Sequence, residues 1–310
     1  MKNQRKLLIV ALLSLLISME EGCASMAISL FYKKAELPES QIVRNIQYSN
    51  LPGSDPIMNR LDLFLPKGKD WPVMIFVHGG GWNEGDKDLK VAGADVYGNI
   101  GRYFASQGIG TAVISYRLMP HVDWKTQVSD VAKATGWVYQ HIQEYHGNPK
   151  NIFLVGHSAG AQIASRVALD ARTLSVIGLS PHLVCGVIPI SGVGYNFLNE
   201  ETNQLGKDEG VYQTLFHKKK LSKSLRKKLS PIFFAKRSSP PFLILYAARD
   251  QKEIQHSSQD LSNWLIKVGA RSQLYSIPKE SHKSTILALS RAKSPAALMI
   301  VFIKTMDCSK

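Results

Sequence analysis

Short apolar runs alternate with longer amphipathic segments over most of this chain. The run at 73–77 contains no polar residue, as expected of a strand that is covered on both faces. Residues 123–145 instead place Val128, Val131, Thr135, Val138 and Ile142 at spacings of three and four, which predicts an amphipathic helix. The alternation predicts an α/β fold with a mostly parallel, twisted sheet and helices on both of its faces.

The same reading assigns the remaining elements. We expect strands at 42–48, 60–65, 73–77, 110–116, 152–155, 183–190, 242–247 and 272–277, and helices at 123–145, 158–169, 259–268 and 296–305. Residues 192–239 have weak periodicity, and loops of that length inside a compact domain are usually functional. We therefore expect a cap insertion at about 192–239 within a domain that covers 30–310.

The N-terminus reads as an export signal over residues 1–22. Lys2, Arg5 and Lys6 precede an apolar run at 7–19, which as a helix of about 20 Å is too short for a hydrocarbon core of about 30 Å. Cys23 follows Gly22 in a sequence that resembles the processing site of bacterial lipoproteins, and we expect its lipidation. The protein would then be periplasmic, membrane-anchored or secreted. Cleavage after Ala27 and an uncleaved N-terminal helix are the alternatives.

Composition limits the cofactors and partners. Apolar residues make up 45% and charged residues 20%, which is typical of globular proteins and argues against disorder or a polytopic membrane protein. Three cysteines, without CxxC or zinc-type spacing, predict no disulfide scaffold and no metal site, and no organic cofactor is expected. Cys185 lies in the apolar run at 183–190, so we expect it to pack in the core.

A candidate nucleophile lies between a predicted strand and a predicted helix. Gly156-His-Ser-Ala-Gly160 follows the strand at 152–155 directly. A nucleophilic serine has to project from a sharp strand-to-helix turn, and flanking glycines allow strand and helix to approach closely. The alternative is a glycine-flanked serine that only caps the helix. The context favours Ser158 as the nucleophile.

A glycine-rich segment follows the strand at 73–77. His78-Gly-Gly-Gly-Trp82 can present adjacent backbone N–H groups to the negative charge that develops on a carbonyl oxygen during acyl transfer. A flexible turn is the alternative interpretation.

An acid and a histidine follow the serine in the chain. Asp250 comes after the strand at 242–247 and His282 after the strand at 272–277. The order Ser158, Asp250, His282 is that of α/β-hydrolases. In such a triad the histidine takes the serine proton and the carboxylate orients the imidazole. Glu253 is the rival acid.

Together with Gly85-Asp-Lys87 and Ser115-Tyr-Arg-Leu118, these motifs resemble the α/β-hydrolase superfamily over about residues 40–306. Within it the chain is similar to the carboxylesterase and hormone-sensitive-lipase-like group, including feruloyl-esterase-like and arylformamidase-like enzymes. The resemblance implies an oxyanion hole made by the N–H groups of Gly80, Gly81 and Ala159. We also expect Trp82 and His157 to contact substrate.

The function that follows is hydrolysis of a small-molecule carboxylic ester through an acyl-enzyme. An amidase, arylformamidase-like or peptidase activity with the same triad is one alternative, and a non-catalytic binding module of the same fold is another.

A basic stretch lies in the expected cap. Residues 217–237 carry nine Lys or Arg and no acid, and the whole chain has a net charge of +14. A solvated helix face or mobile loop is one interpretation, and attraction to an anionic membrane surface or to an acidic substrate is the other. Without interleaved aromatic residues or a recognisable module, we expect no nucleic-acid binding.

Overall fold

The computed structural model describes residues 32–201, 215–217, 220–291 and 295–308. The expected export signal with Cys23, and Lys218 and Lys219 of the basic stretch, lie outside the described residues. Among the described residues, no single helix is long and apolar enough to cross a membrane. The helix pair His282–Ser290 and Pro295–Thr305, which is bent at its break, has the length and composition of a membrane span, and nothing else marks it as one.

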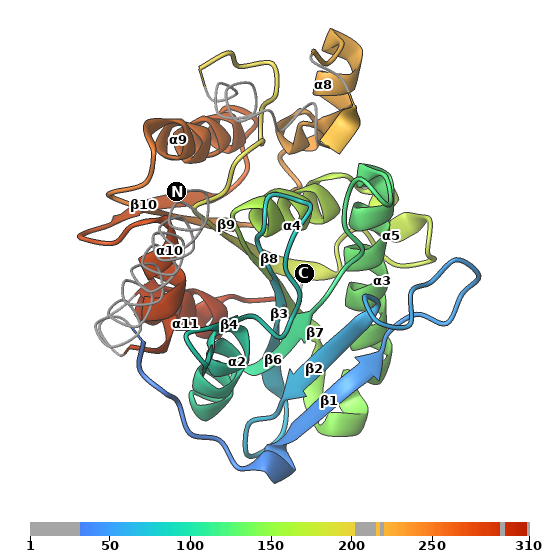
Figure 1. The fold of residues 1–310 in the computed structure, drawn as a ribbon, viewed down its shortest axis with the longest axis vertical. Coiled ribbons are helices and arrows are strands. Elements are labelled where there is room, and N and C mark those ends of the chain that lie inside the picture. Colours follow the sequence, from blue (N-terminus) through green and yellow to red (C-terminus); the bar gives the residue numbers. More distant parts are fainter. Residues whose placement is uncertain (1–31, 202–214, 218–219, 292–294, 309–310) are drawn as a thin grey trace, which may run out of the picture.

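The described chain forms an eight-stranded sheet in the order β1-β2-β6-β3-β7-β8-β9-β10 (Figure 1). These strands are β1 Ile42–Gln47, β2 Arg60–Phe64, β3 Trp71–Val77, β6 Gly110–Ile114, β7 Gly147–His157, β8 Val184–Ile190, β9 Phe242–Ala247 and β10 Ser272–Ile277. β2 is antiparallel to β1 and to β6, and every pair from β6 to β10 is parallel. The predicted fold is confirmed, with each predicted strand in place.

Helices cover both faces of the sheet. The helices are α2 Val96–Ser106, α3 Trp124–His141, α4 Ala159–Leu169, α5 Arg172–Ser175, α8 Lys223–Leu229, α9 Lys252–Lys267, α10 His282–Leu287 and α11 Pro295–Thr305. One core packs α3, α4 and α9 against the sheet, and the other packs α2, α10 and α11 against the opposite face. Alternate residues of β3 divide between the two, with Ile75 in the first core and Phe76 in the second.

α2 has no counterpart in the prediction. Gly98 and Gly101 lower its helix propensity, so its sequence does not look like a helix interior. Tertiary packing explains Gly101, because a Cβ there would lie 2.2 Å from the ring of Phe64 on β2. Asp95 caps the helix by accepting a hydrogen bond from the N–H of Gly98.

The predicted start of α9 was also wrong, because this helix begins at Lys252 rather than at residue 259.

Cys185 is not simply a core residue. It forms a disulfide with Cys308, 123 residues further along the chain, with the two Cα atoms 5.4 Å apart. The bond joins β8 to the segment after α11 and therefore ties the C-terminus to the sheet. Spacing along the chain carries no sign of this pairing, because two distant cysteines reveal their proximity only once the sheet and α11 are packed.

Candidate active site

The predicted site residues follow the carboxyl ends of neighbouring parallel strands. The glycine loop follows β3, Ser158 follows β7, Asp250 follows β9 and His282 follows β10. Since these strands are parallel and pair side by side, their ends lie along one edge of the sheet. The fold thus brings together residues that are more than 200 positions apart in the chain.

Ser158 occupies a strained turn between β7 and α4. Its φ of 53° and ψ of −122° are unusual for a residue with a side chain. A Cβ at Gly156 would lie 2.4 Å from the carbonyl oxygen of Gly160, and a Cβ at Gly160 would lie 2.2 Å from that of His78. The Ser158 side chain makes no capping hydrogen bond. This argues against the interpretation of Ser158 as a helix cap.

Asp250 and His282 form a hydrogen-bonded pair. Nδ1 of His282 lies 3.1 Å from Oδ1 of Asp250, whose side chain is fully buried, whereas about a third of the histidine side chain (32%) is exposed. Oδ2 of Asp250 accepts hydrogen bonds from the N–H of Ala247 at 2.8 Å and from the hydroxyl of Ser191 at 2.6 Å. Glu253, the rival acid, lies in the first turn of α9, and the described contacts include no ion pair between it and His282.

His157 lies between the nucleophile turn and the histidine loop. Its ring centroid is 4.6 Å from that of His282, and its Nε2 lies 3.1 Å from the carbonyl oxygen of His282. Because a carbonyl oxygen only accepts, Nε2 of His157 donates this bond. Burial, with a contribution from His282, holds the pKa of His157 well below its usual range, so the ring is neutral. These contacts indicate that His157 positions His282; a substrate contact stays a prediction.

The described contacts do not include a hydrogen bond between the hydroxyl of Ser158 and His282. The two residues are nevertheless linked through His157, which precedes Ser158 in the chain and contacts His282. Catalytic hydrogen bonds often tighten only when substrate is bound.

The glycine loop is packed on aromatic rings. His78 is fully buried and stacks on Tyr116 with ring centroids 4.2 Å apart, and its Nδ1 lies 2.7 Å from the carbonyl oxygen of Gly79. The Tyr116 hydroxyl donates to the carbonyl oxygen of His78 at 3.0 Å. Burial lowers the pKa of His78 to about 4. The loop is thus held by specific contacts, which argues against a merely flexible turn.

The glycines of this loop adopt backbone conformations that a side chain would not allow. Gly80 and Gly81 have φ of 105° and 55°, and a Cβ at Gly80 would lie 2.1 Å from the carbonyl oxygen of Glu84. Within the described part of the chain, no acceptor is found for the N–H groups of Gly80, Gly81 and Ala159. They therefore remain the predicted donors to an oxyanion.

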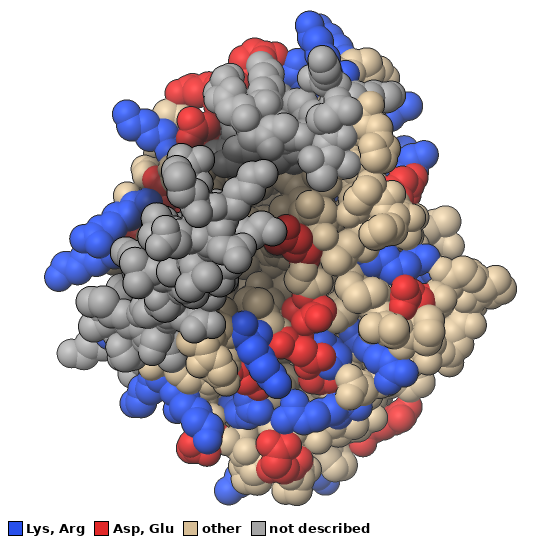
Figure 2. Space-filling model, in the orientation of Figure 1, with Lys and Arg blue, Asp and Glu red and all other residues tan. Residues whose placement is uncertain are grey.

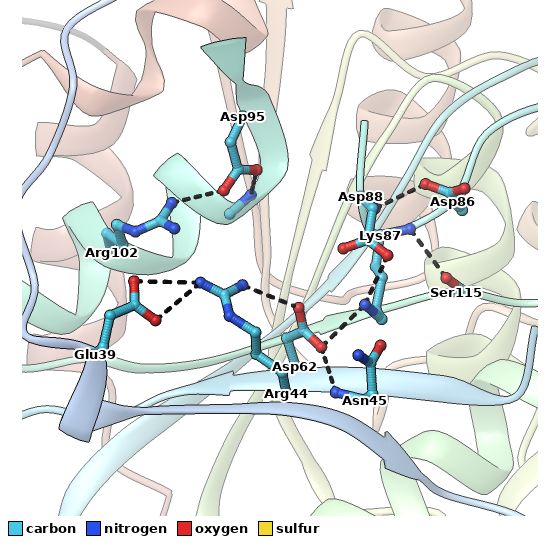
Figure 3. A network of polar contacts seen from close by, with 11 residues as sticks. Glu39, Arg44, Asn45, Asp62, Asp86, Lys87, Asp88, Asp95, Arg102 and Ser115 are labelled. Atoms are coloured by element: carbon cyan, nitrogen blue, oxygen red, sulfur yellow. Dashed lines mark hydrogen bonds and ion pairs between the residues drawn. The ribbon is translucent and has the colours of Figure 1, made fainter. Parts of the chain in front are cut away.

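Two buried ion pairs involve the motifs that follow the glycine loop, and neither was predicted; Figure 3 shows the pair formed by Lys87. Nζ of Lys87 lies 3.0 Å from Oδ1 of Asp62 on β2 and 2.8 Å from Oδ2 of Asp88, and the Lys87 N–H donates to the hydroxyl of Ser115 at 3.0 Å. The second pair joins Arg117 to the fully buried Asp130, with Nη2–Oδ1 at 2.6 Å and Nε–Oδ2 at 2.8 Å. The motifs Gly85-Asp-Lys87 and Ser115-Tyr-Arg-Leu118 thus support the loop that precedes them.

Trp82 ends the glycine loop and contacts the cap. Its Nε1 donates to Oε1 of Gln162 on α4 at 3.2 Å, and Nε2 of Gln162 donates to the carbonyl oxygen of Leu229 at 2.9 Å. The Trp82 ring packs near Phe197, with centroids 6.4 Å apart, in a small apolar cluster with Leu221 and Leu229. The described parts of the expected cap segment therefore pack on the loop beside the site. Sequence reasoning missed Gln162, which looks like an ordinary polar residue of a helix.

Comparisons with known proteins show which family and which relatives this chain resembles. Residues 61–265 match the family model BD-FAE. The chain is 28% identical over 281 residues to isoprenylcysteine alpha-carbonyl methylesterase ICME of Arabidopsis thaliana, covering 86% of this chain and 61% of the relative. It is 28% identical over 269 residues to esterase LipQ of Mycobacterium tuberculosis, covering 83% and 62%. The chain spans about three fifths of the length of these curated relatives.

Solved structures agree on the fold. Esterase B of Lactobacillus rhamnosis superposes with a TM-score of 0.71 at 21% identity, covering 98% of this chain and 95% of the other. An esterase of Pyrobaculum calidifontis superposes with a TM-score of 0.69 at 17% identity, covering 94% and 92%. The predicted resemblance to the hormone-sensitive-lipase-like carboxylesterase group of α/β-hydrolases is confirmed, and since the family model covers well over half of the sequence, this chain belongs to the BD-FAE family.

Proposed function

We propose that this protein is a serine hydrolase that cleaves carboxylic esters through an acyl-enzyme. The observation that carries the proposal is the hydrogen bond between the buried Asp250 and the partly exposed His282, at the sheet edge where Ser158 occupies its strained turn. The relatives named as esterases support it.

In the first half-reaction, the Ser158 oxygen attacks the ester carbonyl carbon while Nε2 of His282 takes the serine proton. The N–H groups of Gly80, Gly81 and Ala159 bind the oxyanion. As the tetrahedral intermediate collapses, the C–O bond to the alcohol breaks and His282 gives its proton to the leaving oxygen. Water then attacks the acyl-enzyme with His282 as the base, the acid leaves, and the proton returns to Ser158.

Labelling with a fluorophosphonate probe tests the nucleophile. We expect the wild type to be labelled and Ser158→Ala not to be labelled, because the probe reacts with an activated serine. Asp250→Asn and His282→Gln should slow both labelling and hydrolysis of p-nitrophenyl esters. Equal labelling of wild type and Ser158→Ala would contradict the proposal. Matched anilides separate the alternatives, since an anilide rate above the ester rate would favour an amidase.

The substrate we propose has an apolar group next to the ester. Trp82, Phe197, Leu221 and Leu229 form an apolar cluster at the end of the glycine loop, which supports an apolar acyl or alcohol group. A series of p-nitrophenyl esters of increasing chain length tests this. We expect kcat/KM to rise with the first added methylenes, and Trp82→Ala to reduce that rise while affecting the shortest ester least.

We also propose that the protein is exported and anchored by lipidation at Cys23. The basic start and the apolar run at 7–19 support export. The disulfide between Cys185 and Cys308 supports it too, because disulfides persist in oxidising compartments. Expression with its own N-terminus should place the wild type in the membrane fraction and Cys23→Ser in the soluble fraction. Equal membrane retention of the two proteins would contradict lipidation.

We further propose that the basic stretch of the cap contacts an anionic membrane surface. α8 carries Lys223, Arg226, Lys227 and Lys228, and Figure 2 shows Lys and Arg side chains at the top of the molecule, where Figure 1 places this helix. Changing Lys218, Lys219 and Lys220 to Glu should weaken binding to anionic vesicles at low salt. Unchanged vesicle binding would favour a solvated helix face instead.

A further inference from the structure

The end of β8 lies between the strand that carries the nucleophile and the strand that carries the acid. The N–H of Ser158 donates to the carbonyl oxygen of Ile190, the last residue of β8, at 2.9 Å. The N–H of the next residue, Ser191, donates to the carbonyl oxygen of Leu245 on β9 at 2.8 Å. Residues 190 and 191 are therefore hydrogen-bonded to both sides of the site.

The side chain of Ser191 continues this link to the acid. It is fully buried, and its hydroxyl lies 2.6 Å from Oδ2 of Asp250. The N–H of Ala247 reaches the same Oδ2 at 2.8 Å and lies 3.3 Å from the serine hydroxyl. With two donors on Oδ2, the other oxygen, Oδ1, faces His282.

The backbone conformation of Ser191 is energetically unfavourable for a residue with a side chain. Its φ is 46°, which glycine would adopt freely. What serine adds at this position is the hydroxyl that reaches Asp250. The terminal torsion of an aspartate is broad, so the carboxylate needs such partners to hold one orientation.

We propose that Ser191 is a positioning residue: its hydroxyl fixes the rotamer of Asp250, and through it the orientation of His282 during ester hydrolysis. The inference rests on the proposed function above. Ser191 does not touch the reacting atoms. It acts through Asp250, and its loss should change the turnover step more than substrate binding.

Kinetics of Ser191→Ala give the first test. We expect kcat for a p-nitrophenyl ester to fall by about tenfold to hundredfold with KM nearly unchanged, as expected when a buried carboxylate loses one donor. The downfield proton resonance of Nδ1–H of His282 should shift or broaden. Ser191→Gly keeps the backbone conformation without the hydroxyl and should behave in the same way, which guards against misfolding of the alanine variant.

Ser258→Ala is the matched control. It also removes a hydroxyl from a fully buried serine, which donates to the carbonyl oxygen of Ile254 within α9, and we expect wild-type kcat and an unshifted proton resonance.

A double-mutant cycle with Asp250→Asn separates positioning from a general loss of stability. If Ser191 acts through Asp250, adding Ser191→Ala to Asp250→Asn should cost far less than it costs in the wild type. Wild-type kcat in both Ser191 variants, or an equal loss in the two backgrounds, overturns the proposal. If the wild type proves inactive, the proposed function fails, while the His282 resonance still reports whether Ser191 holds the pair.

Discussion

At the scale of single residues, the site depends on side chains that hold other side chains. Ser158 is held in a strained turn by close contacts at Gly156 and Gly160, and His282 has a neighbour on each side, Asp250 at Nδ1 and His157 at its carbonyl oxygen. Holding side chains in fixed positions costs conformational entropy and backbone strain, and the free energy gained from packing has to offset that cost. Substitutions at these neighbours should therefore affect turnover through the orientation of Ser158 and His282.

His157→Phe keeps a ring between the nucleophile turn and His282 but removes the donor to the carbonyl oxygen of His282. We expect kcat for a p-nitrophenyl ester to fall by about fivefold at nearly constant KM, since a lost hydrogen bond of this kind contributes about 1 kcal/mol. His157→Gln, which keeps a donor, should lose less. A rise in KM at constant kcat in both variants would favour the direct substrate contact predicted from the sequence.

At the scale of elements, a buried ion pair joins the segment after the glycine loop to β2. Lys87 and Asp62 are both almost fully buried, and Arg44 and the N–H of Asn45 complete the surroundings of the Asp62 carboxylate (Figure 3). Burying two charges costs desolvation energy, and removing Lys87 leaves the Asp62 carboxylate with only the more distant Arg44, at 3.6 Å, and the N–H of Asn45. The loop should therefore be sensitive to the loss of a single partner.

Lys87→Met should lower the free energy of unfolding by about 1–3 kcal/mol, because the buried Asp62 carboxylate loses its nearest cation and keeps only Arg44 and the N–H of Asn45. Lys34→Met is the matched control: the Lys34–Glu36 pair is exposed on both sides, and we expect a change of less than about 1 kcal/mol. Denaturant unfolding measures both. The double variant Lys87→Met with Asp62→Leu should recover much of the loss. Similar stabilities of Lys87→Met and Lys34→Met would show that the pair contributes little.

At the scale of the whole molecule, two apolar cores and one disulfide hold the sheet. The cores lie on opposite faces of the sheet, and the bond between Cys185 and Cys308 closes a long stretch of chain that contains Asp250 and His282 but not Ser158. Buried histidines near the glycine loop add a dependence on pH.

Acid should destabilise the protein through His78. Its folded-state pKa of about 4 lies below that of the unfolded chain, so the unfolded state binds a proton that the native state excludes. The contribution of His78 to the free energy of unfolding is fully present above about pH 6.5. It decreases by about 3 kcal/mol in total as the pH falls towards 4. Urea unfolding across this pH range measures it. His78→Gln should show a smaller loss on acidification, and an identical pH dependence in both proteins would contradict the prediction.

Cys308→Ser should lower the free energy of unfolding by about 2–4 kcal/mol, because the open chain has more conformational entropy when unfolded. Reduced wild type should lose a similar amount, and the variant should be insensitive to reductant. Equal unfolding midpoints for oxidised wild type and Cys308→Ser would show that the bond does not stabilise the fold.

By itself, the sequence determined the strands, the order of the elements and the candidate triad, because apolar periodicity and glycine-flanked motifs are properties of neighbouring residues. It missed α2, whose helix propensity is lowered by two glycines, because only the tertiary structure shows that Gly101 is needed for packing on Phe64 of β2. Tertiary structure alone decided the disulfide, the ion pairs of Lys87 and Arg117, and the placement of Ser191, Gln162 and His157 around the site. These contacts join residues that are distant in the chain. Patterns among neighbouring residues do not indicate which distant side chains come into contact in the folded protein.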